Sequence, residues 1–516
     1  MNGDRYDFII VGAGHNGLVA AAYLAKAGRK VLVLERRPLV GGSVITEEFA
    51  PGFEADAIWT GGNLRPGVVK DLGLTRPPPA DRPPFISLLA AGRVDRASRG
   101  TSDGATYVDH LVIDSDPRKA PESIRRFSEK DAAAWPEFVR FMHRAAALLD
   151  EAYATIMPRL AKNISLQEGM GLAELGIDLR LMGRKDMLNV IRMLPMTAVE
   201  FLEEWFESQE LKAALASVAI HGLTLGPMSA GTGFTLLHNW LNRGGLAHVN
   251  VGKAGVITQT LAEAVTRFGG QIRVEAEVER IQIDTYTCGG VVLQGGEEIR
   301  AKAVISGADP KRTYLSLVGP MNLPPEFVWR VQCIKMRGSV AKLHLLTDGS
   351  HGIPEGTLVV APTTNYLERA YDAAKYGEIS ERPYLEVSTS GTVVSIHVQF
   401  APHGLRTSNW HEQRSDLERL AIDTLSSHFP ALKSSIVIRK LLTPLDLEST
   451  YSLTEGDLNH GQLMLDQFLF MRPIPGWSNH RTPIDNLYLC GSGVHGGGGV
   501  SGTAGRNAAR FLLRQR

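Results

Sequence analysis

The chain has 516 residues, with 55 Lys and Arg, 55 Asp and Glu, and a formal net charge of zero. This balance argues against nucleic-acid binding, and 44% apolar with 21% charged residues excludes a disordered chain. Glycine is in excess, at 53 residues, whereas cysteine occurs only three times and never in a CxxC pair. We expect a cytoplasmic protein without disulfides or a metal centre. No apolar run is long enough for a membrane span, while peripheral membrane contact and a homodimer stay open.

The first glycine cluster follows a short apolar run at residues 7–11 and reads Gly-Ala-Gly-His-Asn-Gly over 12–17. A helical pattern over 18–27, a second strand at 30–34 and the acid Glu35 complete a dinucleotide-binding fingerprint. Its glycines permit a tight turn, backbone approach to a diphosphate and close helix–strand packing, and the helix N-terminus attracts phosphate. The predicted cofactor contacts are Gly12, Gly14, His15, Asn16, Gly17, Glu35 and Arg36.

A second glycine pair, Gly41 and Gly42, lies just past this acid, with Thr46 four residues after it. The pair is similar to the second FAD motif of flavin amine oxidases and carotenoid desaturases. Those proteins usually carry arginine after the pair, where this chain has Ser43. The resemblance implies FAD contacts at all three positions, with one phosphate-side contact in question. The alternative for the pair is an ordinary glycine loop.

The segment that follows is predicted to leave the nucleotide-binding part of the chain. Residues 76–84 are proline-rich, which excludes a helix or a central strand and indicates a solvent-exposed connection. Helical patterns then occur at 121–155, 198–221 and 234–241, and the last carries His238.

The nucleotide-binding pattern returns with a helix at 256–268, strands at 271–274 and 276–281, and a hairpin that leads to Gly307. In the flavin amine oxidase and desaturase superfamily, the strand equivalent to the one that contains Val278 contacts the adenine end of FAD through its backbone. We therefore predict Val278 and Gly307 as cofactor contacts. The alternative is that both strands serve only as sheet core.

Further strands are expected in a second insertion over residues 313–454, for example at 339–346 and 392–400, with a helix at 414–429. Asp466 and Gln467 precede an expected apolar strand at 468–470. These two residues are candidates to line the site, although sheet packing is the simpler interpretation.

The last glycine cluster follows a strand at 486–490 and extends from Gly491 to Gly502, before a final helix that begins at Thr503. The chain ends before a second nucleotide-binding fold has room to form. The cluster is therefore expected to join the same cofactor domain, where glycine permits close backbone approach and the helix N-terminus stabilises negative charge. The predicted contacts here are Gly491, Ser492, Gly499, Val500 and Ser501. For Cys490 we expect a buried thiol rather than a covalent flavin link.

Together these motifs make the whole chain similar to bacterial phytoene desaturase-type flavoproteins. The resemblance implies an α/β fold, with a Rossmann-like FAD-binding domain of the glutathione reductase/amine oxidase type and an interleaved α+β substrate domain. The expected FAD-binding domain comprises 1–75, 240–312 and 455–516, and the substrate domain 76–239 and 313–454. The resemblance also implies noncovalent FAD.

The predicted activity is that of an FAD-dependent dehydrogenase or desaturase, which transfers a hydride from a largely apolar small-molecule substrate to flavin N5. Oxygen, a quinone or another acceptor then reoxidises the flavin. His495 is the first candidate for a general base, because histidine titrates near neutrality, and His238 is a second. For His495, His238 and His460, a purely structural role is the competing interpretation. Alternative functions are a flavin amine oxidase, an isomerase that needs reduced FAD, and a non-catalytic FAD-containing binding protein.

Overall fold

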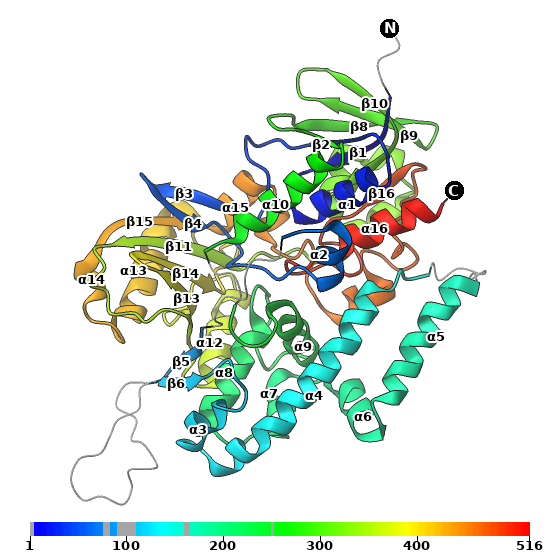
Figure 1. The fold of residues 1–516 in the computed structure, drawn as a ribbon. Coiled ribbons are helices and arrows are strands. Elements are labelled where there is room, and N and C mark those ends of the chain that lie inside the picture. Colours follow the sequence, from blue (N-terminus) through cyan, green and yellow to red (C-terminus); the bar gives the residue numbers. More distant parts are fainter. Residues whose placement is uncertain (1–4, 76–82, 90–109, 159–165, 249–251, 516) are drawn as a thin grey trace, which may run out of the picture.

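The computed structural model describes residues 5–75, 83–89, 110–158, 166–248 and 252–515. Two seven-stranded sheets lie at opposite ends of the molecule, and a layer of helices lies beneath them (Figure 1). The proline-rich connection predicted at 76–84 falls mostly outside the described residues.

The first sheet combines a parallel half with an antiparallel half. The parallel strands, in spatial order, are β7 (Gln271–Arg273), β2 (Val31–Leu34), β1 (Tyr6–Val11), β10 (Glu298–Ser306) and β16 (Leu487–Leu489). The first half of β10 pairs antiparallel with β9 (Thr287–Leu293), which pairs with β8 (Val278–Asp284). The central strands are apolar, as expected for parallel strands that are covered on both faces.

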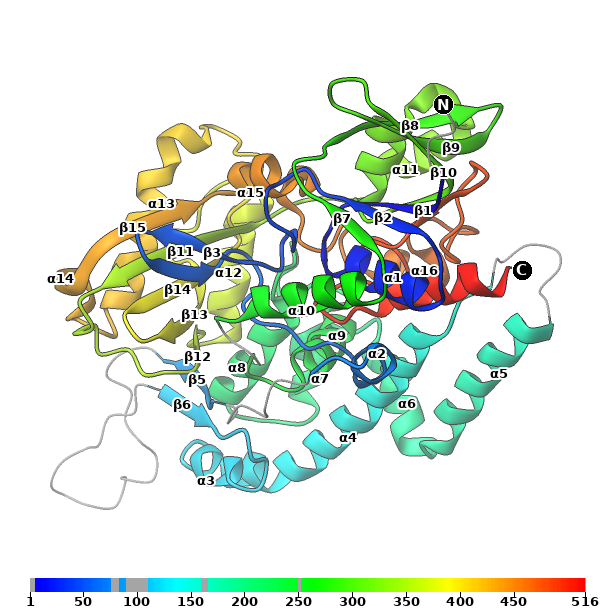
Figure 2. The same cartoon turned by 45° about the horizontal axis from the view of Figure 1, so that its top comes forward.

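Helices cover one face of this sheet. They are α1 (His15–Lys26), α2 (Pro66–Leu72), α10 (Ala254–Arg267) and the C-terminal α16 (Thr503–Arg514). On the other face pack the π-helix η2 (Arg312–Val318), the short 3₁₀ turn η3 (Pro320–Asn322) and α11 (Pro325–Gln332). Figure 2 shows α1, α10 and α16 side by side, although they come from the start, the middle and the end of the chain.

The second sheet has one apolar and one polar face. Its spatial order is β15 (Ile436–Leu442), β11 (Val340–Thr347), β14 (Val393–Gln399), β13 (Tyr384–Ser390), β12 (Thr357–Val360), β5 (Phe85–Leu88) and β6 (His110–Ile113). Alternate residues, such as Leu343, Ile396 and Val387, form a core with helix α13 (Trp410–Ser426). The other face carries buried polar side chains, in which Lys342 pairs with His397 and His397 with Glu386 in register.

The helical layer is built around an aromatic core and borders the polar face of the second sheet. Its helices are α3 (Ala120–Arg125), α4 (Glu129–Ala154), α5 (Leu166–Leu181), α6 (Arg184–Met193), α7 (Ala198–Glu203), α8 (Gln209–Ile220), α9 (Thr232–Arg243) and α12 (Thr364–Lys375). The helix expected over 198–221 is two helices, because the Asp131 carboxylate accepts hydrogen bonds from the backbone of Glu207 and Ser208 at the break.

Shorter elements connect these layers. They are the hairpin β3 (Thr46–Ala50) and β4 (Phe53–Asp56), α14 (Leu432–Ser435), α15 (Pro444–Tyr451) and the 3₁₀ turns η4 (Thr454–Gly456), η5 (Leu465–Gln467) and η6 (Leu469–Met471). The strand predicted at 468–470 is therefore wrong. The following Pro473 has no N–H to offer a strand ladder, and the Gln467 side chain donates to its carbonyl instead.

The two sheets draw on different parts of the chain. Strands of the first sheet come from residues 6–34, 271–306 and 487–489, and those of the second from 85–113 and 340–442. This origin agrees with the interleaved arrangement, while the domain boundaries themselves stay a prediction. Among the described residues, no helix combines the length and the apolar character needed to cross a membrane.

Candidate functional site

A cavity with an empty volume of about 950 Å³ lies at the carboxyl ends of β1, β2 and β10. This is the edge of a parallel sheet at which α/β proteins bind nucleotides. Most of the predicted contacts line it: Gly12, Gly14, His15, Asn16, Gly17, Glu35, Arg36, Gly41, Gly42, Ser43, Val278, Gly307, Gly491 and Ser492.

The first two glycine motifs meet backbone to backbone at this cavity. Gly14 and Gly41 form an isolated parallel bridge, and the Gly41 N–H donates to the Ala13 carbonyl at 2.9 Å. A Cβ atom on Gly42 would lie 3.2 Å from the Gly14 Cα, while one on Gly17 would lie 2.3 Å from the Gly12 carbonyl oxygen. The glycines therefore let α1 and the following loop approach closely enough to frame the cavity.

Glu35 holds the turn at the end of β2. Its buried carboxylate accepts from the Ala13 N–H at 2.8 Å and from the Arg37 N–H at 3.0 Å. A carboxylate offers about four lone-pair sites, so acceptor capacity is left for ribose hydroxyls. The guanidinium of Arg36 donates to the carbonyls of Ser449 and Thr450.

Several lining residues were not predicted from the sequence. They are Arg37, Ala308, Arg312 and the segment Tyr451–Leu453, besides His460, which was named only as a weak catalytic candidate. Ala276 and Glu277 also line the cavity and lie in the strand that was predicted to contact the adenine end. Tyr451–Leu453 ends α15 and reaches the cavity from a distant part of the chain, so no local motif marks it.

The C-terminal loop meets the first motif on the other side. Asn16 donates to the Ser492 hydroxyl at 3.3 Å and accepts from the Gly505 N–H at 3.3 Å. The predicted contacts Gly499, Val500 and Ser501 do not line the cavity. Gly499 contacts the His15 ring through its backbone, whereas Val500 and Ser501 accept backbone hydrogen bonds from the segment 63–65.

The two predicted catalytic histidines lie outside the cavity lining. His495 donates from Nε2 to the Ala152 carbonyl at 3.0 Å, and burial lowers its pKa to about 4. His238 lies between the Tyr153 hydroxyl, 2.7 Å from its Nδ1, and the Asn242 amide nitrogen, 2.9 Å from its Nε2. Because both nitrogens of His238 have partners and burial lowers its pKa to about 3, these contacts favour an anchoring role.

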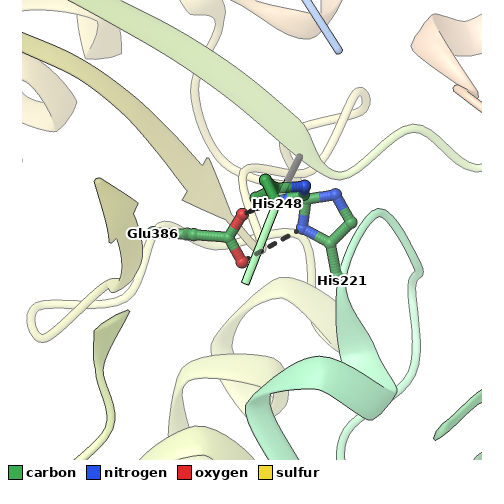
Figure 3. A group of neighbouring side chains, drawn as sticks. All are labelled: His221, His248 and Glu386. Atoms are coloured by element: carbon green, nitrogen blue, oxygen red, sulfur yellow. Dashed lines mark hydrogen bonds and ion pairs between the residues drawn. The ribbon is translucent and has the colours of Figure 1, made fainter. Parts of the chain in front are cut away.

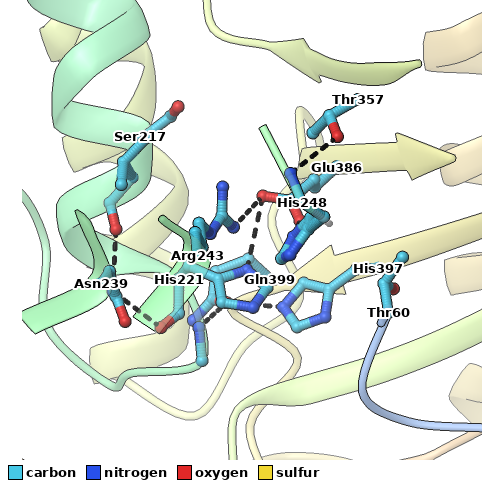
Figure 4. A network of polar contacts seen from close by, with 12 residues as sticks. Thr60, Ser217, His221, Asn239, Arg243, His248, Thr357, Glu386, His397 and Gln399 are labelled. Carbon is cyan, nitrogen blue, oxygen red and sulfur yellow. Dashed lines mark hydrogen bonds and ion pairs between the residues drawn. The ribbon is translucent and has the colours of Figure 1, made fainter. Parts of the chain in front are cut away.

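A polar cluster lies on the inner face of the second sheet, where Glu386 on β13 contacts two imidazoles and one guanidinium (Figures 3 and 4). Its carboxylate accepts from Arg243 at 2.6 Å and from His248, and lies 3.4 Å from His221 Nδ1. Burial alone raises the pKa of Glu386, but Arg243 and the two imidazoles outweigh it and hold that pKa well below its usual value. Burial lowers the pKa of both His221 and His248.

Two imidazole nitrogens and a carboxylate within 4.8 Å of one another resemble a site for a divalent cation. Arg243 already balances the charge of Glu386, however, so a divalent cation would add two uncompensated charges to a buried region. The charges therefore favour an ion-pair network between the helices and the sheet.

Lys342 lies in the same row of the sheet and is fully buried. It donates to the Thr60 hydroxyl at 3.0 Å, and burial lowers its pKa to about 8 against the opposing effect of Asp56 and Glu386. Sequence reasoning missed this residue. The available signal was a single lysine at an inward position of a strand whose other polar residues are His344 and Thr347.

A smaller cavity of about 240 Å³ lies beside this polar face. It is lined by the segments 222–224, 337–340 and 456–459 and by Gln462. His460, within the same loop, lines the larger cavity, so one loop borders both spaces.

Comparisons with known proteins agree with this geometry. The family model for flavin containing amine oxidoreductases matches residues 17–513. The chain belongs to this family. A pyridine nucleotide-disulfide oxidoreductase domain-containing protein 2 from Rattus norvegicus is 33% identical over 99% of this chain and 94% of its own. One of the subunits of limonene dehydrogenase from Castellaniella defragrans is 25% identical over 98% and 94%. A solved oxidoreductase from Methanosarcina mazei shares the fold, with a TM-score of 0.59, 16% identity, and coverage of 98% and 100%.

Family membership confirms the predicted Rossmann-like α/β fold and the prediction of an FAD-dependent oxidoreductase. It implies a flavin cofactor and a small-molecule substrate. The resemblance to desaturase-type flavoproteins is also confirmed, because phytoene desaturase from Pantoea ananas is among the relatives. The cysteines Cys288, Cys333 and Cys490 are free thiols.

Proposed function

We propose that the protein binds FAD noncovalently in the larger cavity and removes a hydride from a carbon of a largely apolar small molecule. The observation that carries this proposal is that three glycine-rich segments, far apart in the sequence, line one cavity at the end of one parallel sheet. Bound FAD would supply a two-electron acceptor, which oxygen, a quinone or another oxidant then restores.

The residues present fit a dinucleotide. The N-terminus of α1 opens on the cavity at Gly14 and His15, where free backbone N–H groups favour phosphate. Glu35 lies where ribose hydroxyls need an acceptor, and Val278 lies beside it at the expected adenine end. Cys490 is fully buried, and burial raises its thiol pKa to about 12, which supports noncovalent attachment.

Lys342 is the residue that we propose on the substrate side. Its partner Thr60 belongs to the segment whose later residues, Asn63 and Arg65, bond to Val500 and Ser501 in the C-terminal loop. With a pKa of about 8, Lys342 carries its proton at neutral pH and donates a charged hydrogen bond to Thr60. It lines neither cavity, so we propose that it acts on the substrate through this polar face. We propose that His495 and His238 anchor the C-terminal loop to α4 and α9.

A second candidate function, oxidation of an amine, is favoured by the polar face of the second sheet. A pure hydrocarbon would offer no hydrogen-bond partner to Lys342, His397 and Glu386, which is unfavourable for buried polar groups. A substrate that pairs an apolar body with one polar group satisfies both observations.

Purified protein is expected to be yellow. Denaturation should release one FAD per chain, identified by chromatography against FMN and riboflavin standards, because no covalent link holds it. Protein that stays colourless after incubation with FAD would contradict the proposed function.

Replacing Lys342 by methionine should leave FAD bound but slow substrate-dependent bleaching of the flavin about 100-fold, the usual effect of losing a preorganised donor. Anaerobic stopped-flow absorbance with limonene and with cyclohexylamine measures this rate. Lys440→Met, an exposed lysine on the neighbouring strand β15, is the matched control and should bleach like the parent protein. Equal rates for both variants would remove Lys342 from the reaction, and no bleaching of the parent by either compound would contradict the proposed substrate class.

A further inference from the structure

Two imidazoles reach the larger cavity with nitrogens that have no hydrogen-bond partner among the residues that the structure describes. These atoms are His15 Nε2 and His460 Nδ1. Both nitrogen atoms are buried, although His460 as a residue is only half-buried, and a buried polar atom without a partner is costly, so each needs an explanation. A ligand in the cavity supplies one.

His15 lies where an anion is expected. It is the first residue of α1, directly after Gly14, so its ring stands beside the free N–H groups of the helix N-terminus. The Gly499 backbone lies near this ring and favours its protonated form. The unpartnered Nε2 is the atom left for a ligand.

His460 also lines the cavity and has a left-handed backbone conformation, with φ of 57°. Its loop is held by the buried guanidinium of Arg472, which donates to the carbonyls of Asn459, Gly461 and Ser492. Burial lowers the pKa of Arg472 to about 10, so it stays cationic and places a positive charge beside this loop. The loop therefore presents His460 to an anion.

Ser43, after the second glycine pair, brings no charge to the cavity. His15 and His460 are close enough to each other to interact electrostatically, so both rings can act on one diphosphate bound near the α1 N-terminus.

Without a ligand, both rings are neutral at physiological pH. Burial lowers the pKa of His15 to about 4, with a further contribution from His460, and burial also lowers the pKa of His460. The charged groups that act on the pair or line the same cavity are Asp309, Arg472, Glu35, Arg36, Arg37, Glu277 and Arg312. A diphosphate brings two negative charges beside the rings, which favours the protonated form of an imidazole.

We propose that His15 and His460 bind the diphosphate of FAD through these unpartnered nitrogens, and that the pair takes up a proton from solvent when FAD binds. The inference rests on the proposed function, because it requires FAD in this cavity. It predicts that FAD affinity increases as the pH falls. The imidazole is neutral in the empty protein and charged in the complex, so FAD binding takes up a proton. For one proton, the FAD affinity then rises by up to about tenfold for each pH unit that the pH falls.

Isothermal titration of the FAD-free protein with FAD tests this coupling, at pH 6, 7 and 8 and in two buffers of different ionisation enthalpy. The diphosphate of FAD has no ionisation in this range, so a buffer-dependent heat reports protons taken up by the protein. We expect proton uptake at pH 7 and affinity at least about tenfold higher at pH 6 than at pH 8. Riboflavin, which lacks the diphosphate, should bind without this dependence.

His15→Gln and His460→Gln should each weaken FAD binding mainly at pH 6 and reduce the proton uptake, while riboflavin binding is unchanged. His411→Gln, at an exposed position of α13, is the matched control. Circular dichroism checks that each variant folds. If a variant does not fold, the titration of the parent protein still decides whether FAD binding is coupled to proton uptake. FAD binding without proton uptake would overturn the inference and leave the proposed function intact, whereas absence of FAD binding to the parent would overturn both. Equal loss of riboflavin affinity in the variants would place the rings on the flavin and overturn the diphosphate assignment.

Discussion

Gly17→Ala should lose FAD and lower the stability of the protein. The added Cβ would lie 2.3 Å from the Gly12 carbonyl oxygen and 3.3 Å from an Ile10 methyl carbon, so the first turn of α1 has to move away from β1. Helix α1 is enclosed by the sheet, α10 and α16, and overpacking in such a place costs about 2 kcal/mol or more. If that cost falls on the phosphate-binding turn, FAD affinity falls about thirtyfold or more.

Gly176→Ala provides the matched control, because it makes the same change in another helix. Gly176 lies on α5, is exposed, and has no atom within 4 Å of the added Cβ. Alanine should stabilise this helix by about 0.5–1 kcal/mol and leave the FAD content unchanged. Thermal unfolding and the flavin-to-protein absorbance ratio measure both effects, and a Gly17→Ala protein that is as yellow and as stable as the parent would contradict the packing argument.

The cofactor side of the site was predictable because its signals are local. A strand, a glycine turn, a helix and an acid within residues 7–35 impose one backbone path, and the structure brings Gly12, Gly14, Gly17 and Glu35 to one cavity. The same holds for Gly491 and Ser492, since a strand leads directly into them.

The polar row of the second sheet was not predictable, because it depends on pairing between distant strands. Lys342, His397 and Glu386 form one row only through the register of β11, β14 and β13, which no local pattern specifies. For His495, in contrast, a local signal was present but misleading. This residue stands inside the glycine loop in sequence, yet its ring points to the end of α4 at Ala152, because the loop turns through several left-handed glycines.

Glu386→Gln should destabilise the protein by about 3–5 kcal/mol at neutral pH, because it leaves the Arg243 guanidinium buried without a counter-charge. The pKa of Glu386 in the folded state lies below its ordinary value. Its contribution to the free energy of unfolding is therefore present above the pKa of the unfolded state and is lost as the pH falls through the pKa of the folded state. The difference in the free energy of unfolding between parent and variant should therefore be largest at pH 7 and should decrease in acid. Thermal midpoints should differ by about 3–5 °C at pH 7.

Glu297→Gln is the control for this measurement. Glu297 pairs with Arg273 at 2.7 Å in a bidentate arrangement, but both side chains are about half exposed, so the loss should stay below about 1 kcal/mol. The double variant Arg243→Met/Glu386→Gln removes both buried charges and should recover most of the lost midpoint. If Glu386 instead served to hold a divalent cation, the double variant would be no more stable than Glu386→Gln, and zinc added to the parent would raise its midpoint. Recovery in the double variant, without a response to zinc, is the result expected of an ion pair that ties α9 to the second sheet.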